Sequence, residues 1–292
     1  MNLPTPPLSI GLPVFNGEKY LEALLDSVLG QTYSDFNLII SDNASTDRTQ
    51  EICRSYAAQE PRICYHRNEK NIGATQNWYR VFDLSASEYF APVAHDDSYD
   101  PEYMRKCLEV LAGDPSVVVC YSKTKVIDEN GNFVGNFEVE VDTTSPSPHE
   151  RLYRVLTTDY LCIQLYGVMR SNALRATRVY AGYYGCDKNT LFELCLLGKM
   201  QELPEYLFYH RLYPNALGAA MNSGRSLEEL LFLDPGTNWD DRFSAVSVYR
   251  NYFLSVPRLV PSRAERLRCY VQLQRVMLDK SVKRTRRLLR HN

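Results

Sequence analysis

The sequence predicts an α/β protein with a mainly parallel sheet flanked by helices, followed by a helical C-terminal extension. In the first hundred residues, short apolar runs typical of buried strands alternate with segments whose apolar residues recur every three to four positions. This alternation is typical of right-handed crossovers between parallel strands. From about residue 226 the pattern is helical throughout, and no internal repeat is present.

The apolar periodicity places the elements in order. Strands are expected at 8–15, 36–41, 62–66 and 89–94, separated by helices at 18–29, from 45 onwards and at 74–84. Further elements are expected as a helix at 101–111, a strand at 117–121, a hairpin of 123–127 and 133–139, and a short strand at 207–212. Pro92 conflicts mildly with its strand, because proline lacks a ladder donor. We expect a first domain at 1–220 and the extension at 221–292.

Composition narrows the class of protein. The chain has 292 residues, 45% hydrophobic and 23% charged, which is ordinary globular composition. A formal charge of −2 argues against a nucleic-acid-binding protein. The eight scattered cysteines are expected to be reduced thiols, mostly buried. The start of the chain is polar and proline-rich, and no stretch approaches the ~20 apolar residues of a spanning helix. We therefore expect a cytoplasmic protein, with peripheral contact at the inner face of a membrane as the alternative.

Polar residues follow the predicted strands where each one ends. They are Asn16, Asp42, the stretch 68–71 and the stretch 95–97. Ligands of open α/β sheets bind outside the carboxyl ends of the strands, so these residues are expected to share one site.

These strand ends, taken in order, resemble family 2 glycosyltransferases of the GT-A fold. The resemblance covers roughly residues 8–215. It rests on Leu-Pro13-Val-Phe15-Asn16-Gly, Asp42-Asn-Ala-Ser-Thr-Asp47, Asn68-Glu-Lys-Asn71-Ile-Gly73 with Asn77, and Ala94-His95-Asp96-Asp97. It implies a GT-A-like, Rossmann-like domain that moves a sugar from a nucleotide diphosphate to an acceptor, usually with inversion and a divalent cation.

For the nucleotide, Phe15 can pack on the base and Asp42 can accept an N–H such as that of uracil. Pro13, Asn16, Asn71 and Asn77 complete the nucleotide-sugar residues that the resemblance implies. Helix capping is the competing interpretation of Asp42, and capping or a solvated face competes for Asn71, Asn77 and Arg80.

For the metal, the resemblance implies Mg²⁺ or Mn²⁺ on an Asp-x-Asp motif, although Ala94 stands at its first acidic position. Asp96 is the best single ligand, and Asp97 contacts the metal or the sugar. His95 is interpreted as a packed or solvent-facing residue. Residues 96–100 also read Asp-Asp-x-x-Asp, as in prenyl-diphosphate enzymes, but those carry the motif within a helix. Asp100 before proline fits a helix cap instead.

For the acid–base chemistry, the resemblance assigns the general base to Asp187, with Cys186 where the family has glutamate. An N-cap role is the alternative for Asp187. His210 or Arg211 is expected to pair with the diphosphate, or else to lie on the surface.

The last helical segment, residues 263–290, contains ten Lys or Arg and two acids. It predicts either a peripheral anchor on anionic lipid or a solvated or oligomer-forming tail.

We therefore expect an inverting, metal-dependent glycosyltransferase of polysaccharide or cell-envelope biosynthesis. We expect a nucleotide-diphospho-sugar, UDP-linked, as the donor and a glycan, a lipid-linked molecule or another hydroxyl compound as the acceptor. The competing hypotheses are a noncatalytic nucleotide- or glycan-binding relative and a nucleotidyltransferase. The latter class usually carries a glycine-rich phosphate loop after its first strand, which this chain lacks. Sugar, pathway and oligomeric state are left open.

Overall fold

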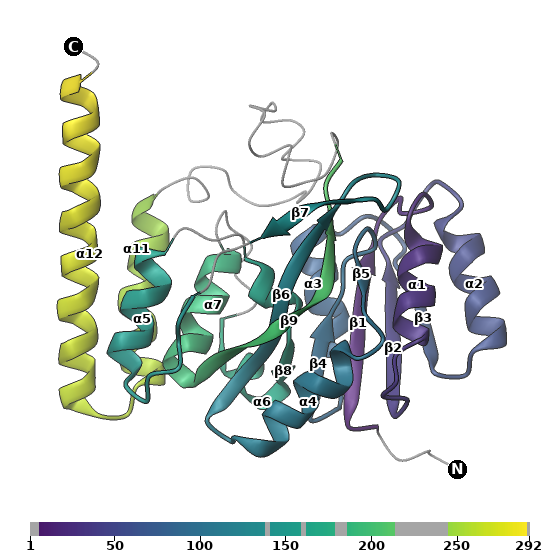
Figure 1. The fold of residues 1–292 in the computed structure, drawn as a ribbon, viewed down its shortest axis with the longest axis horizontal. Coiled ribbons are helices and arrows are strands. Elements are labelled where there is room, and N and C mark those ends of the chain that lie inside the picture. Colours follow the sequence, from purple (N-terminus) through teal and green to yellow (C-terminus); the bar gives the residue numbers. More distant parts are fainter. Residues whose placement is uncertain (1–5, 138–140, 159–161, 179–185, 214–244, 291–292) are drawn as a thin grey trace.

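The computed structural model describes residues 6–137, 141–158, 162–178, 186–213 and 245–290, and these form one mixed sheet covered by helices on both faces (Figure 1). The strands are β1 (Leu8–Val14), β2 (Phe36–Asp42), β3 (Ile63–Arg67), β4 (Tyr89–Pro92), β5 (Ser98–Tyr99), β6 (Val117–Ile127), β7 (Phe133–Phe137), β8 (Val168–Arg170) and β9 (Lys199–Arg211). Their order is β3-β2-β1-β4-β8-β6-β9-β5, with β7 pairing along β6. The predicted fold class is confirmed.

The direction of the strands fixes where a site can form. β1 to β4 are parallel, β8 runs antiparallel between β4 and β6, and β9 is parallel to β6. Six strands, β1–β4, β6 and β9, therefore end at the same edge of the sheet, the upper edge in Figure 1, here called the carboxyl edge.

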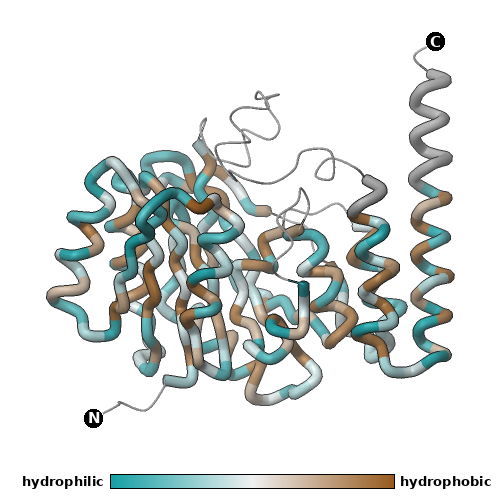
Figure 2. Tube along the Cα trace, turned by 180° about the vertical axis from the view of Figure 1, so that it is seen from behind, coloured by the Kyte–Doolittle hydropathy of each residue, from teal (hydrophilic) through white to brown (hydrophobic). Residues whose placement is uncertain are grey.

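Two apolar cores cover the two faces of the sheet. One face carries α1 (Leu21–Leu29), α2 (Thr49–Gln59) and α4 (Tyr103–Gly113). The other carries α3 (Ala74–Asp83), α5 (Pro148–Thr157), α6 (Ser171–Ala176), α7 (Cys186–Leu197), α11 (Ala245–Leu259) and α12 (Arg263–Arg290). A short 3₁₀ helix, η1 (Ile163–Tyr166), precedes β8. Figure 2 shows the resulting pattern, with apolar residues along the strands and the inward helix faces and polar residues outside.

Most predicted elements are present, with changes at their ends. The expected strand at 117–121 and the first arm of the hairpin are one strand, β6, and the hairpin to β7 is present. β9 starts at Lys199, eight residues before the expected strand, because it pairs along the whole of β6. β5 and β8 were not predicted; two and three residues are too few for a periodic signal. Pro92 is tolerated because it is the last residue of β4.

The start of α2 differs from the prediction. The helix begins at Thr49, and neither Ser45 nor Thr46 caps it. The Asp47 carboxylate accepts the Thr49 N–H at 3.0 Å, just before the helix. Although burial raises the pKa of Asp47, the hydrogen bonds from Thr49 outweigh it and leave this pKa lowered.

The two last helices share the core of the sheet domain. Val256 of α11 and Leu273 of α12 are fully buried in the same cluster as Phe192 of α7. Glu193 of α7 stabilises the contact between α7 and α11. Its buried carboxylate accepts a hydrogen bond from Ser255 and forms an ion pair with Arg258 at 2.5 Å. The predicted domain boundary at 220/221 lies outside the described residues.

We expect Arg258→Met to lower the free energy of unfolding by about 2–3 kcal/mol, since it leaves the Glu193 carboxylate buried without its cation. The loss is smaller than for a fully buried pair because 32% of the Arg258 side chain is exposed. Urea unfolding followed by circular dichroism measures it. The double variant Glu193→Leu/Arg258→Met should recover most of the loss, and a double variant as unstable as the sum of the single variants would contradict this account.

Candidate active site

The acidic loop after β4 is held from within by Asp97. Its side chain is 1% exposed, and its Oδ1 lies 3.0 Å from His210 Nδ1 and accepts the backbone N–H of Arg211 at 3.0 Å. The next residues form β5, which pairs with β9 through Ser98 and Tyr209. Asp97 therefore ties the end of β4 to the end of β9.

Burial and charge shift the pKa values of this pair. Burial raises the pKa of Asp97, and the hydrogen bond with His210 offsets only part of that shift. Burial lowers the pKa of His210, but the hydrogen bond and charge of Asp97, together with the charge of Asp96, outweigh it and leave this pKa raised. His210 Nδ1 faces Asp97, and its Nε2 has no hydrogen bond within the described part of the chain.

Asp96 lies one residue earlier and is half-buried rather than enclosed. Its Oδ2 accepts a hydrogen bond from the Tyr213 hydroxyl at 2.9 Å, and its backbone carbonyl accepts one from Arg211 Nε at 2.8 Å. The Tyr213 ring packs against Tyr20 with centroids 5.2 Å apart. Tyr213 was not singled out in the sequence, although it stands two residues after a predicted site residue, Arg211.

Arg211 is engaged within the protein. It is 5% exposed, its guanidinium donates to the carbonyls of Asp128 at 3.0 Å and Glu129 at 3.4 Å, and it lies 4.6 Å from the centre of the Tyr20 ring. These contacts place it beneath the turn between β6 and β7. Its predicted pairing with a diphosphate stays a prediction, and His210 is the more accessible of the two.

His95 matches the simpler interpretation, whereas Asp100 does not cap α4, which begins at Tyr103 with Glu102 at its N-cap. A Cβ on Gly17 would lie 2.8 Å from His95 Cδ2, so His95 packs closely on the loop after β1. Asp100 Oδ1 accepts the Glu102 N–H at 3.0 Å, immediately before α4. The acids at 96–100 therefore span a loop and β5 and not a helix, which excludes the geometry of a prenyl-diphosphate motif.

Asp42, at the end of β2, is completely buried. Its Oδ1 accepts the Ser45 N–H at 2.9 Å. Its Oδ2 accepts the Tyr65 hydroxyl at 2.8 Å and forms an ion pair with Arg67. Asp42 thus shapes the loop after β2, and its contact with a base stays a prediction.

The loops after β1 and β2 bind each other at the carboxyl edge. Asn16 is exposed and has a φ of 50°, a left-handed conformation that asparagine tolerates better than most residues. Its N–H donates to Ser45 Oγ at 2.9 Å, and its Oδ1 accepts the Thr46 N–H at 2.8 Å. Pro13 and Phe15 are half-buried beside it.

A buried amide network supports these loops. Asn77 is 2% exposed, and it accepts from Ser41 Oγ at 2.7 Å and from Asn68 Nδ2 at 3.0 Å while donating to the Ser41 carbonyl at 2.8 Å. Asn43 Nδ2 donates to Asn71 Oδ1 at 2.7 Å, and Asn71 Oδ1 also accepts the Gly73 N–H at 2.8 Å. Of the predicted nucleotide residues, Asn77 is therefore inside the network and Asn71 at its surface.

Asp187 is exposed in the first turn of α7, and its Oδ1 accepts the Lys188 N–H at 2.8 Å. Burial raises the pKa of Tyr166 in η1, and the charges of Asp97, Asp96 and Asp187 raise it further. The charges of the loop after β4 and of Asp187 therefore act on the same phenol.

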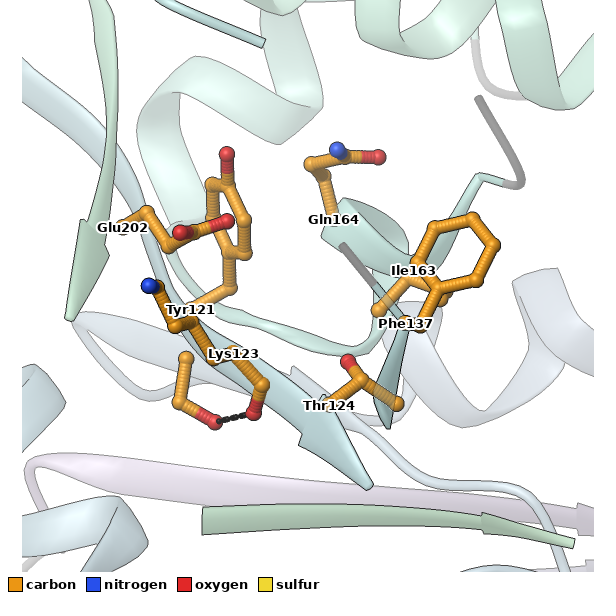
Figure 3. A pocket seen from close by; sticks show the side chains of 8 residues that line it. Tyr121, Lys123, Thr124, Phe137, Ile163, Gln164 and Glu202 are labelled. Carbon is orange, nitrogen blue, oxygen red and sulfur yellow. Dashed lines mark hydrogen bonds between the residues drawn. The ribbon is translucent and has the colours of Figure 1, made fainter. Parts of the chain in front are cut away.

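A small pocket lies between β6, η1 and β9 (Figure 3). Its polar lining includes Lys123, Glu202 and Gln164. Gln164 is 2% exposed, and its Oε1 finds no hydrogen-bond partner among the residues that the structure describes. The pocket was not predicted, because its residues come from four elements, β6, β7, η1 and β9, that are separated in the sequence.

The family assignment follows from the sequence comparison. The profile described as Glycosyl transferase family 2 matches residues 9–180, more than half of the chain. The chain belongs to glycosyl transferase family 2. An uncharacterized glycosyltransferase of Methanocaldococcus jannaschii is 28% identical over 137 residues, which are 46% of this chain and 47% of that protein. The chondroitin synthase of Escherichia coli is 31% identical over 132 residues, 45% of this chain and 19% of that protein. The matched parts thus cover less than half of these relatives.

Solved structures confirm the GT-A fold. Staphylococcus aureus TarS in complex with UDP-GlcNAc has a TM-score of 0.60 at 17% identity, over 89% of this chain and 69% of that one. The mannosyltransferase PcManGT of Pyrobaculum calidifontis, in complex with GDP-Man and Mn²⁺, has a TM-score of 0.54 at 12% identity, over 94% and 86% of the two chains.

We expect Asn77→Ala to act on stability and not on ligand affinity, because it leaves the buried partners of the amide unsatisfied. The free energy of unfolding should fall by about 1–3 kcal/mol. Urea unfolding measures the loss. The matched variant Asn71→Ala, at the surface of the network, should cost less, and equal losses would contradict the distinction.

The stability of the wild type should fall between pH 6 and pH 9 because of His210. A histidine whose pKa is raised by folding stabilises the folded state fully below its unfolded pKa of about 6.5, and this contribution is lost as the pH rises through the folded pKa. Urea unfolding at pH 6, 7.5 and 9 should show a steeper decline for wild type than for His210→Gln. Parallel declines would show that the pair does not titrate as described.

Proposed function

We propose that this protein transfers a sugar from a nucleotide-diphospho-sugar, UDP-linked, to a hydroxyl acceptor with inversion at the anomeric carbon. The observation that carries the proposal is the loop after β4, where Asp96 stays accessible beside His210, whose ring Asp97 holds at 3.0 Å. Family membership and the GT-A fold support it, and so does the UDP-GlcNAc complex of TarS.

The nucleotide is proposed to bind over the loops after β1 and β2. Pro13 and Phe15 offer a half-buried apolar surface for a planar base. Asn16 is exposed beside them, and Arg67, partly exposed, lies on Asp42. The Asp42 Oδ2 already binds Tyr65 and Arg67, and a base could reach this oxygen only by sharing it with them. The main role proposed for Asp42 is therefore to fix the conformation of the loop after β2.

The diphosphate is proposed to lie near Asp96 and His210. The donor set fits Mg²⁺ or Mn²⁺ only with help from the substrate, since no group of three acidic, histidine or cysteine ligands exists among the described residues. Such ions are commonly held by one or two carboxylates plus substrate phosphates, a role that Asp96 can fill. When bound, the ion supplies neutralisation of the charge that develops on the leaving diphosphate. Protonated His210 adds a positive charge there, and Asp97 holds its ring in place.

The acceptor is proposed to approach from the side of α7. Asp187 is exposed, so it can take the proton of an acceptor hydroxyl while the oxygen attacks the anomeric carbon. A single displacement of this kind inverts the configuration. The pocket of Lys123, Glu202 and Gln164 lies next to η1, and the buried, unpartnered amide oxygen of Gln164 suits a bound water there.

A noncatalytic relative that binds nucleotide or glycan is the second candidate. Ala94 and Cys186 stand where the family resemblance expects acids. If both acids were required, the site would bind a donor without turning it over.

Donor hydrolysis and transfer across a panel of UDP- and GDP-sugars, with and without Mn²⁺, test the proposal. Asp187→Asn should lower kcat by roughly 10²–10⁴-fold with donor binding retained, because it removes only the proton acceptor. Asp96→Ala should weaken donor and metal binding together. Asp279→Asn, an exposed helical acid on α12, serves as the matched control. Nucleotide binding without turnover in the wild type would favour the noncatalytic relative, and unchanged activity in both site variants would overturn the assignment of roles.

A further inference from the structure

The helix α12 has apolar residues on two opposite faces. The inward face buries Cys269, Leu273 and Val276 against the core shared with α5 and α11. On the outward face, Leu267, Val271 and Leu278 are 66%, 54% and 66% exposed. These three residues are here called the outer stripe. Burial against the body of the protein explains the first face and leaves the second unexplained.

The outer stripe runs along the helix in one line. Its spacings of four and seven residues return to the same side of an α-helix, and they cover about 16 Å of helix length. The same spacing continues along the sequence at Val282 and Leu289 within the helix. Arg268 and Arg275 are exposed on one side of the stripe, where Arg268 pairs with Glu265 at 2.7 Å and Arg275 lies 4.9 Å from the centre of the Tyr153 ring.

Charge is separated strongly between α12 and the rest of the chain. Ten of the 33 Lys and Arg residues and two of the 35 Asp and Glu residues lie in α12. The formal charge is therefore +8 on this helix and −10 on the rest of the protein. Five of the cations lie between Lys283 and Arg290, in the part of α12 that rises past α5 and α11 in Figure 1.

We propose that α12 lies in the plane of an anionic lipid surface, with the outer stripe inserted among the acyl chains and its cations on the headgroups. An exposed apolar line on a strongly basic helix is what such binding requires. A nucleic acid would use the cations and leave the stripe in water. A second copy of α12 would bury the stripe but bring two helices of charge +8 together.

The rest of the molecule agrees with this orientation. No helix in the described ranges has the length and apolarity to cross a bilayer. The excess negative charge of the other elements is repelled by anionic headgroups, which leaves α12 as the attached element. In Figure 1 the carboxyl end of α12 points in the same direction as the carboxyl edge of the sheet.

Co-sedimentation of the full chain with vesicles tests the proposal. The protein should bind vesicles of 30% phosphatidylglycerol in phosphatidylcholine. Its affinity for vesicles of phosphatidylcholine alone should be lower by about tenfold or more, because each Lys or Arg near an anionic surface adds to the attraction. The triple variant Leu267→Gln/Val271→Gln/Leu278→Gln should bind the anionic vesicles about tenfold more weakly. The quadruple variant at Lys283, Arg284, Arg286 and Arg287, each changed to Gln, should lose at least as much.

Two controls test whether the effect is specific to α12 and whether the variants fold. The variant Arg54→Gln/Lys70→Gln, on exposed positions outside α12, should bind like wild type, and circular dichroism and unfolding should show that all variants keep the fold. No sedimentation with anionic vesicles, or equal binding by wild type and the two α12 variants, would overturn the proposal. A dimer by light scattering that the triple variant abolishes, without vesicle binding, would replace it with a second copy of the chain. Vesicle binding is measured without glycosyl transfer. The proposal of a lipid contact and the proposal of glycosyl transfer can therefore each fail without the other.

Discussion

The buried carboxylate of Asp97 joins the two halves of the site. It receives the ring of His210 and the backbone N–H of Arg211, so the loop after β4 and the end of β9 are fixed to each other. A buried carboxylate needs such partners, because an unpaired charge in the interior is costly. The need for partners gives the adjacent residues Asp96 and Asp97 different roles. Asp97 is enclosed by its partners, while Asp96 stays accessible with Tyr213 on one oxygen.

The loops after β1 and β2 likewise combine buried and exposed polar groups. Asn43, Asn68 and Asn77 bury their amides in one another and in the end of β2, and this fixes the loops after β1 to β3. Asn16 is exposed and has a left-handed conformation. Hydrogen bonds with Ser45 and Thr46 of the loop after β2 hold it in place. Buried polar groups thus build the carboxyl edge, and exposed ones remain for a ligand.

The sequence could predict the location of the site but not the orientation of each side chain. Periodicity identified β1–β4, and the direction of parallel strands then placed Asn16, Asp42 and Asp96 at one edge. Whether a residue there is buried depends on partners distant in sequence. Arg67 and Tyr65 enclose Asp42 from β3, and no local pattern announces that contact. Elements as short as β5 and β8 carry too little pattern to predict, although β8 sets the sheet order between β4 and β6.

If a divalent cation binds the loop after β4, Asp96 is the acid that can hold it. With Ala94 at the first acidic position of the motif and Asp97 enclosed, Asp96 is the carboxylate of this loop that remains open to an ion. One carboxylate holds Mg²⁺ or Mn²⁺ weakly by itself, because these ions require several oxygen ligands. The diphosphate of the donor can provide the missing oxygens. Metal and donor binding should therefore be reciprocally coupled, each strengthening the other by the same factor. A site of this kind retains a cation mainly while a nucleotide-diphospho-sugar is present, so the loss of the first acid need not remove a metal-dependent function.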